Sequence, residues 1–420
     1  MSSVTQNPQT AGTPGPGGMI AEQPNQSFLQ NLQKVLRENI REYGMYIALF
    51  VIMAFFTFTT DGIFISSRNI SNLINQTGYI AVLAVGMTLV IVIRHIDLSV
   101  GFLAGFLGAI AAIALTFWKL PVGLVLPLTL GLGIIAGLGT AFLVAQMKIP
   151  SFVASLAGWL AYRGALQLVT AGTGTIIVSD PIFNALSNGF IPDIPGLENF
   201  LPGIHKLTLI LGILAIILFF VSSLNDRRKK IAYNFEVLPR DMFILKIVFV
   251  SLLIAGITWI LAGYQGLSWT AVIVVTVVAI YDFTANKTVL GRHIYAIGGN
   301  PDAAELSGIS VKKITFIVFG SMGMLSALSG ILFTSRLQSA TTTAGTLFEL
   351  DAIAAAYVGG VSAAGGVGSV VGSLIGALVM TSLTSGMNLM GIDISYQYIV
   401  RAAVLVMAVI FDVTTRNRGY

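Results

Sequence analysis

The residue types that normally carry enzyme chemistry are scarce and scattered in this sequence. Its 420 residues include no cysteine, which excludes disulfides, iron–sulfur clusters and thiolate metal sites. The three histidines, His95, His205 and His293, stand far apart, so a histidine metal site or a Ser–His–Asp triad has poor support and no metal is expected. No Walker A pattern is present. We therefore expect neither a catalytic centre nor a cofactor in this chain.

Five ionisable residues lie in or beside apolar stretches, where charge is costly and normally has a pairing or functional role. They are Asp97, Arg163, Glu349, Asp351 and Arg401. Asp97 stands in an Ile-Asp-Leu-Ser junction, which favours capping of a helix that begins at Leu98 over a proton relay. Glu349 and Asp351 suit the positive start of another helix, and the two arginines are expected to pair with carboxylates or carbonyls. All five are assigned structural roles.

Neutral polar side chains near apolar stretches are the candidates for a solute path. Hydroxyl and amide groups with aromatic rings nearby would suit a sugar, although most such groups bond one helix to another. The path candidates are Asn75, Gln76, Ser151, Ser155 and Asn388. A carrier driven by protons or sodium ions usually needs more carboxylates in mid-span than this sequence offers.

One polar stretch between two apolar segments has the capping residues of a short helix. Asn300 can N-cap it, and Pro301 falls at the first helical position, where a missing N–H does no harm. Gly308 can take the left-handed conformation that ends a helix. The pattern predicts a two-turn helix over 301–307.

Two interpretations of this helix stay open. The capping, the preceding Gly298–Gly299 hinge and the small Ala303–Ala304 face favour a rigid contact for a soluble partner. The alternative is a solvated loop helix.

Composition indicates the elements that must position these residues. The chain is 55% hydrophobic and only 10% charged, where soluble proteins have about a quarter charged residues, and its mean hydropathy is +0.86. We predict an all-α polytopic membrane protein with 12 spans, with 10 as the alternative count. The spans are placed at 43–60, 78–93, 98–118, 121–147, 151–171, 207–224, 243–262, 268–283, 314–334, 348–364, 367–388 and 398–413. Glycines four residues apart, such as Gly133 and Gly137, indicate close helix packing.

The remaining segments set the expected orientation. Residues 1–27 lack apolar content and are predicted to be a disordered leader, whereas 28–42 has the spacing of an amphipathic interfacial helix. Basic residues gather in 28–42, in the loops 225–241 and 284–313, and in the tail 414–420. The positive-inside rule therefore places both termini of the 43–413 membrane domain in the cytoplasm and explains the net charge of +5 without nucleic acid.

The longest external segment, 171–206, is expected to hold a short helix over 180–186, and is either a docking surface or a plain connector.

Three long motifs in order carry a family resemblance. They are Ala84-Val-Gly-Met-Thr-Leu…Ile-Asp-Leu-Ser-Val-Gly101, Leu290-Gly-Arg-His-Ile-Tyr-Ala-Ile-Gly-Gly-Asn-Pro-Asp-Ala-Ala-Glu-Leu-Ser-Gly-Ile309, and Glu349-Leu-Asp-Ala-Ile-Ala-Ala-Ala…Gly-Gly-Val-Ser-Ala-Ala-Gly-Gly-Val-Gly…Gly-Ser-Leu-Ile-Gly-Ala-Leu378. The chain resembles the permease subunits of ribose/xylose-type ABC sugar importers over about residues 70–175 and 265–413. The segment 383–398 resembles the multiple-monosaccharide branch, near the xylose permeases, and the extra pair of spans around 225–241 fits this larger branch, because ribose-type members lack it. Arg94 departs from the pattern, because many members have glycine or a small residue there.

The resemblance implies a type II-like permease architecture in the bacterial inner membrane. Two permease copies, a homodimer, would form the pore for a pentose or hexose such as xylose, arabinose, galactose or glucose. A cytoplasmic ATPase, usually with two fused nucleotide-binding domains, would bind ATP and Mg, and an extracytoplasmic sugar-binding protein would deliver the substrate. The implied coupling residues are Gly291, Arg292, Tyr295, Gly298, Gly299, Asn300, Pro301, Ala303, Ala304, Glu305 and Gly308. The alternative function is an ion-coupled secondary sugar carrier.

Overall fold

A computed structural model of the chain describes residues 40–196, 201–235 and 237–416. The predicted leader over 1–27 and nearly all of the predicted interfacial helix over 28–42 lie outside these residues. The tail over 414–420 is described as far as residue 416.

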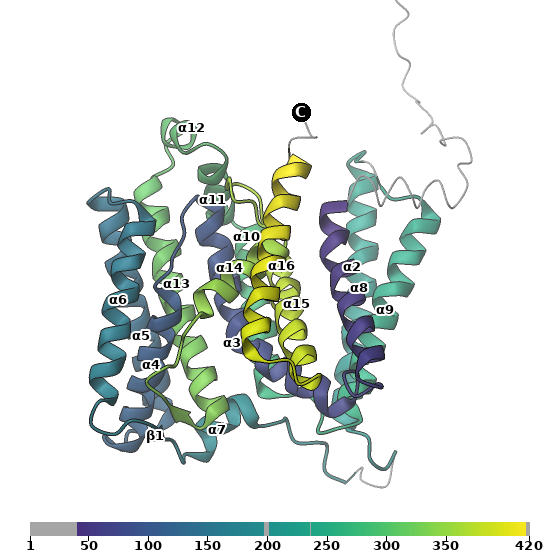
Figure 1. Ribbon diagram of the computed structural model, residues 1–420. Coiled ribbons are helices and arrows are strands. Elements are labelled where there is room, and N and C mark those ends of the chain that lie inside the picture. The colour runs from purple at the N-terminus through teal and green to yellow at the C-terminus, as the bar shows by residue number, and fades with distance from the viewer. Residues whose placement is uncertain (1–39, 197–200, 236, 417–420) are drawn as a thin grey trace, which may run out of the picture.

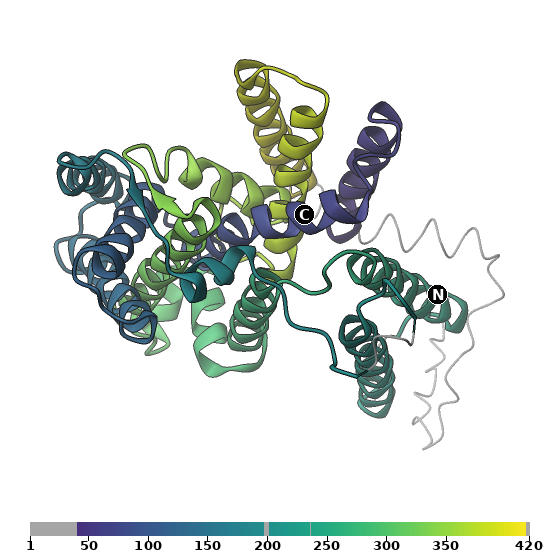
Figure 2. The ribbon, with the colours of Figure 1, turned by 90° about the horizontal axis from the view of Figure 1, so that it is seen from below.

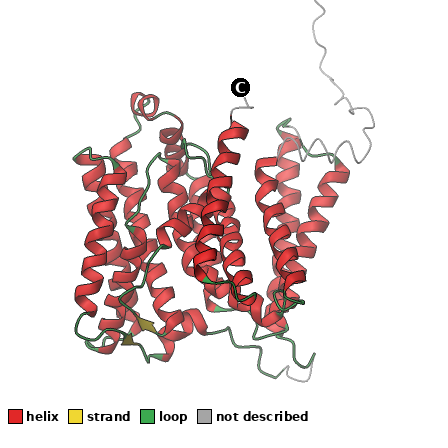
Figure 3. Ribbon diagram, viewed as in Figure 1, coloured by secondary structure: helices red, strands yellow, loops and turns green. Residues whose placement is uncertain are grey.

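The described chain is a bundle of long helices with one pair of very short strands (Figures 1 and 3). The helices are α2 (Ile40–Thr59), α3 (Ser67–Val92), α4 (Val100–Thr116), α5 (Val122–Ala141), the π-helix η1 (Phe142–Gln146), α6 (Ser151–Thr170), α7 (Pro181–Asn188), α8 (Lys206–Ala232), α9 (Arg240–Ala262), α10 (Trp269–Lys287), α11 (Val289–Gly299), α12 (Pro301–Leu306), α13 (Val311–Leu337), α14 (Phe348–Val358), α15 (Val370–Leu389) and α16 (Ile394–Arg416). The strands β1 (Ile176–Ile177) and β2 (Ser339–Ala340) pair antiparallel. The prediction of an all-α membrane protein is confirmed.

Each of the twelve predicted spans contains a helix. Nine helices of the described chain are long and apolar enough to cross a membrane, and the apolar parts of α2 and α4 are somewhat shorter. The span predicted over 348–364 is wrong in one respect, because α14 has only 11 residues. At 1.5 Å per residue it covers about half of a hydrocarbon core of roughly 30 Å. Between β2 and the start of α14, residues 341–347 cover the rest of this distance without a helix.

Small residues let the central helix α13 approach its neighbours closely. A Cβ atom on Gly133 would collide with the carbonyl oxygen of Gly323, and one on Gly137 would collide with that of Phe319. The predicted packing role of these two glycines is therefore confirmed. The buried core extends from this contact into α3, which is buried along most of its length.

The bundle has two unlike ends. We call the end that carries α11 and α12 the α12 face; α2 begins and α16 ends there, while β1 and α7 lie at the opposite face (Figure 1). The predicted short external helix is present as α7, with the carboxylate of Asp180 accepting the N–H of Phe183 at 2.9 Å. The α8–α9 pair projects to one side of the bundle, and α15 and α16 project to another (Figure 2).

Candidate functional site

The six-residue helix α12 stands out from the α12 face (Figure 1). The side-chain oxygen of Asn300 accepts the N–H of Ala303 at 3.1 Å, and Pro301 occupies the first helical position. Gly308 ends the element with φ of +83°, a left-handed conformation that glycine adopts without strain. The helix predicted from these residues is therefore present, with both of its ends fixed locally.

Exposure divides the residues expected to contact a partner. Arg292, Ala303 and Glu305 are exposed, whereas Gly291, Gly298 and Ala304 are buried. Of the two alanines in the small face expected to dock, Ala303 is exposed and Ala304 packs into the core. Sequence reasoning missed Leu306, whose side chain is 91% exposed at the end of α12. The sequence did mark this residue, because Leu306 is the one large apolar side chain in a short helix whose other residues are polar or small.

The preceding helix α11 is attached firmly to the ends of the membrane helices. The hydroxyl of Tyr295 donates to the carbonyl oxygen of Gly368 at 2.8 Å, just before α15 begins. A Cβ atom on Gly298 would collide with the carbonyl oxygen of Val92, the last residue of α3. α11 therefore connects α12 to both α3 and the segment before α15.

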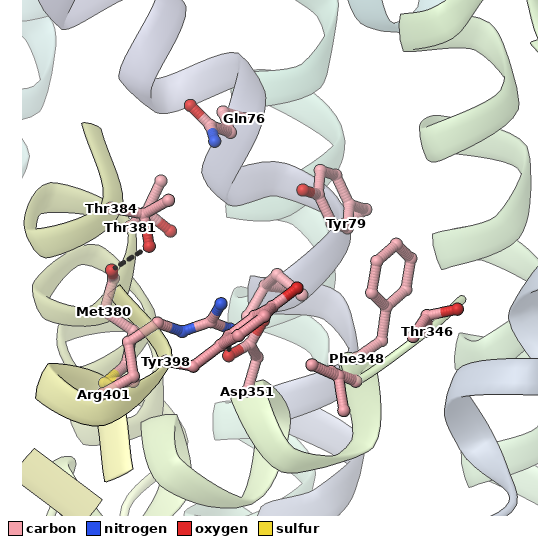
Figure 4. A pocket seen from close by; sticks show the side chains of 12 residues that line it. Gln76, Tyr79, Thr346, Phe348, Asp351, Met380, Thr381, Thr384, Tyr398 and Arg401 are labelled. Carbon is pink, nitrogen blue, oxygen red and sulfur yellow. Dashed lines mark hydrogen bonds and ion pairs between the residues drawn. The ribbon is translucent and has the colours of Figure 1, made fainter. Parts of the chain in front are cut away.

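A second feature is a cavity of about 160 Å³ within the bundle. Figure 4 shows side chains from α3, α14, α15 and α16 directed toward it. Its lining residues are Gln76, Tyr79, Ile80, Thr346, Leu347, Phe348, Asp351, Met380, Thr381, Thr384, Tyr398 and Arg401. The cavity lies where α14 begins in the middle of the bundle, after Leu347 in a left-handed backbone conformation (φ 65°).

The cavity combines one ion pair with neutral hydrogen-bonding groups and aromatic rings. The guanidinium of Arg401 pairs with the carboxylate of Asp351 and lies 6.0 Å from the ring centre of Tyr398 (Figure 4). The expectation that Arg401 pairs with a carboxylate is met. Around the pair, Gln76 and the threonines offer donors and acceptors, and Tyr79 and Phe348 offer ring faces.

Only one of the five predicted path residues, Gln76, lines this cavity. Ser151 and Ser155 instead hold the extended segment before α4, because their hydroxyls bond to the N–H and the carbonyl of Ile96, each at 3.4 Å. Asn388 accepts a 2.7 Å bond from Gln397, which joins α15 to α16. Asn75 is buried, and its side-chain oxygen has no bonding partner among the described residues.

Three of the residues assigned structural roles gather at the N-terminal part of α4. Asp97 accepts bonds from the N–H (2.9 Å) and hydroxyl (2.6 Å) of Ser99, and α4 begins at Val100 rather than at the predicted Leu98. Glu349 accepts the indole N–H of Trp159 at 3.0 Å. Arg163 does not pair with it; its guanidinium lies 5.6 Å from the ring centre of Phe102 and 5.4 Å from that of Trp159.

Sequence reasoning missed most of the cavity. Tyr79, Phe348, Thr346, Thr384 and Tyr398 all line it, yet none was singled out. The available signal was Tyr79, which stands one helical turn after Gln76 and so shares its face. The remaining residues are brought together only by the fold.

Comparisons with known proteins agree along nearly the whole chain. Residues 69–409 match the family described as branched-chain amino acid transport system / permease component. The chain is 40% identical to the xylose transport system permease protein of Haemophilus influenzae, over 92% of this chain and 99% of the relative. It is 38% identical to the corresponding Escherichia coli protein, over 91% and 94%.

A ribose import permease protein of Haemophilus influenzae is 35% identical, over 88% of this chain and 93% of that protein. No solved structure matches the chain. With a short protruding helix and a cavity among multiple membrane spans, the chain belongs to the family of ABC-type transport-system permease components that includes the xylose and ribose permeases, and it is a transporter subunit rather than an enzyme.

Proposed function

We propose that this chain is the membrane subunit of an ATP-driven importer of monosaccharides, and that it moves its solute by alternating access. The observation that carries the proposal is α12, which presents an exposed Leu306 on a helix whose ends are fixed and whose base is attached to the membrane helices. The sequence has no P-loop, so ATP and Mg belong to a partner chain. The names of its relatives support a pentose such as xylose or ribose as substrate.

The α12 face is the cytoplasmic side in this proposal. The basic residues at the tip of α8–α9 and those around α11 and α12 lie at this end of the bundle, which supports the orientation through the positive-inside rule (Figure 1). The membrane is then the bacterial inner membrane, and both termini are cytoplasmic. The opposite face, with α7 and its flanking loops, receives a sugar-binding protein.

Two copies of the chain form the complete pore, and an ATPase with two fused nucleotide-binding domains binds beneath them. Each α12 seats in one half of the ATPase, so closure of the ATP-bound halves tilts the attached spans as rigid bodies. Leu306 is the apolar anchor of this contact, since buried apolar side chains at the centre of an interface carry much of its affinity.

The solute passes through the cavity between α3 and α14–α16. Its volume of about 160 Å³ is similar to that of a protein cavity of about 150 Å³ that admits benzene, so a six-membered sugar ring fits its scale. Threonine hydroxyls and the Gln76 amide match sugar hydroxyls, and the rings of Tyr79 and Tyr398 suit the apolar face of a sugar.

Affinity purification of the chain from its own membranes tests the assembly. We expect an ATP-hydrolysing subunit to co-purify in detergent, with two permease copies per complex by native mass spectrometry. A chain that purifies alone under several mild detergents, with no associated ATP hydrolysis, would contradict the proposal.

A further inference from the structure

We propose that Arg94 is a positioning residue that joins the coupling segment α11–α12 to the helices around the cavity. The proposal rests on the function given above. If α12 moves with the ATPase, the helices around the cavity move with it, because the Arg94 side chain holds α11 against them.

The Arg94 side chain bonds to the end of α11. Its Nε donates to the carbonyl oxygen of Gly298 at 2.7 Å, and Nη2 donates to that of Gly299 at 2.5 Å. These carbonyls belong to the last turn of α11, where a helix leaves acceptors unpaired and favours a cation. Asn300, the N-cap of α12, follows directly. The guanidinium therefore fixes the point at which α12 leaves the bundle.

The same side chain packs on a third segment of the chain. A Cβ atom on Gly365 would collide with Cγ of Arg94, so the arginine stem lies directly against that glycine. The N–H of the next residue, Gly366, donates to the carbonyl oxygen of Val92 at 2.9 Å. Three segments distant in sequence, at 92–94, 298–299 and 365–366, thus meet at one place.

The backbone conformation of Arg94 is unfavourable for a residue that carries a Cβ atom. Its φ is +64°, a left-handed conformation that costs a residue with a Cβ atom but costs glycine nothing. The turn itself would accept glycine at this position. The contacts of the Arg94 side chain with Gly298, Gly299 and Gly365 offset the conformational cost of this backbone geometry.

Two of the three segments of the junction, 92–94 and 365–366, lead to the cavity. α3 runs from Val92 back to Tyr79 and Gln76, which line it. The 359–369 segment joins α14, which carries Asp351, to α15, which carries Thr384. Rigid helices that share one packed junction form the kind of continuous connection through which coupling between sites acts.

Cysteine labelling of the complex of permease and ATPase in lipid nanodiscs tests this role. The chain has no cysteine, so Thr384→Cys in the cavity is the one thiol of the permease, and its labelling is read on the permease band after the subunits are separated by gel electrophoresis. With Arg94 present, we expect ATP to change the rate at which a maleimide labels this cysteine. Arg94→Gln and Arg94→Gly should keep ATP hydrolysis within about twofold, but reduce the ATP-dependent change in labelling about tenfold, within the usual range for coupled sites. Arg94→Lys, with one ammonium in place of the fork, should retain part of the response.

Two controls separate this role from a general disturbance. Lys148→Gln removes another cytoplasmic cation with a left-handed backbone (φ 58°), in the loop before α6, and should leave the response intact. Thr173→Cys, exposed in the opposite-face loop, should label at the same rate with and without ATP.

Several results would overturn the proposal. A full labelling response in Arg94→Gly would show that position 94 needs only its backbone conformation. Loss of ATPase binding in Arg94→Gln would show that the arginine contacts the ATPase instead. If the unaltered complex hydrolyses no ATP, the proposed function itself fails; if it responds to ATP and the Arg94 variants respond equally, only the role of Arg94 fails.

Discussion

At the scale of single residues, α12 joins a locally fixed backbone to one outward apolar side chain. The caps at Asn300, Pro301 and Gly308 could be predicted because capping depends on neighbours within a few positions. The burial of Ala304 and the exposure of Leu306 could not, because they depend on how α12 sits on α13. In a sequence this rich in apolar residues, a leucine such as Leu306 does not reveal from its type alone whether it is buried or exposed.

Replacing Leu306 tests the docking role of α12. Leu306→Asp should leave the fold intact, since the side chain is 91% exposed, yet weaken binding of the ATPase. Loss of an anchoring side chain costs roughly 2 kcal/mol, or about thirtyfold in Kd. Titration of the purified ATPase onto the permease in nanodiscs measures this, with Leu306→Met as the apolar control. Equal affinities for the two variants would remove Leu306 from the interface.

The ion pair in the cavity gives a second prediction at this scale. Arg401 and Asp351 keep only 17% and 18% of their side-chain surface exposed, so Arg401→Met leaves a poorly solvated carboxylate. We expect a loss of about 3 kcal/mol in stability, at the lower end for buried pairs. The double variant Arg401→Met/Asp351→Leu should regain most of it, as measured by thermal unfolding in detergent.

Sugar uptake separates structure from function for the same pair. If the pair binds solute, the double variant stays inactive although its stability returns. Normal uptake by a stable double variant would show that the pair only holds α14 to α16.

At the scale of elements, hydrophobicity predicted where helices lie but not where one stops short. Every predicted span holds a helix, because a helix satisfies its backbone hydrogen bonds internally where lipid offers no partner. The end of α14 at Val358 escaped prediction because residues 352–364 carry no charge and continue the apolar stretch. The cavity escaped for a related reason, since its walls come from residues as distant in sequence as Gln76 and Arg401 and no local pattern marks them.

The loop before α8 supplies a prediction about pH. Burial acts to raise the pKa of the Asp193 carboxyl, but the N–H groups of Leu207, Lys206 and Ile194 and the nearby His205 outweigh it and hold the pKa below its usual range. A lowered pKa in the folded state stabilises the fold above the unfolded value of about 3.9, and this contribution declines as pH falls from there through the folded value. The start of α8 should therefore stay fixed throughout the neutral range.

Hydrogen exchange measures this effect at the amides of Lys206 and Leu207. Asp193→Ala should speed their exchange at pH 7, whereas Asp61→Ala, in the exposed turn after α2 on the same face, should not. Unchanged protection in Asp193→Ala would show that the carboxylate does not hold this helix start.

At the scale of the whole molecule, the fold places the two candidate functional features, α12 and the cavity, at opposite ends of one packed connection. α12 lies at one face, the cavity lies within the bundle, and α3 and the 359–369 segment join them. Family membership could be predicted from three motifs, because the same segments that build this connection are the ones that carry the resemblance. The greater identity to the xylose permeases than to the ribose permeases agrees with the predicted branch.

The source of energy for transport tests the central claim most directly. The permease, its ATPase and its sugar-binding protein are reconstituted in proteoliposomes, and uptake of radiolabelled xylose and ribose is measured. We predict uptake of at least one sugar that requires ATP on the α12 side and persists when proton and sodium gradients are abolished. Uptake that continues without ATP and follows an ion gradient would contradict the account.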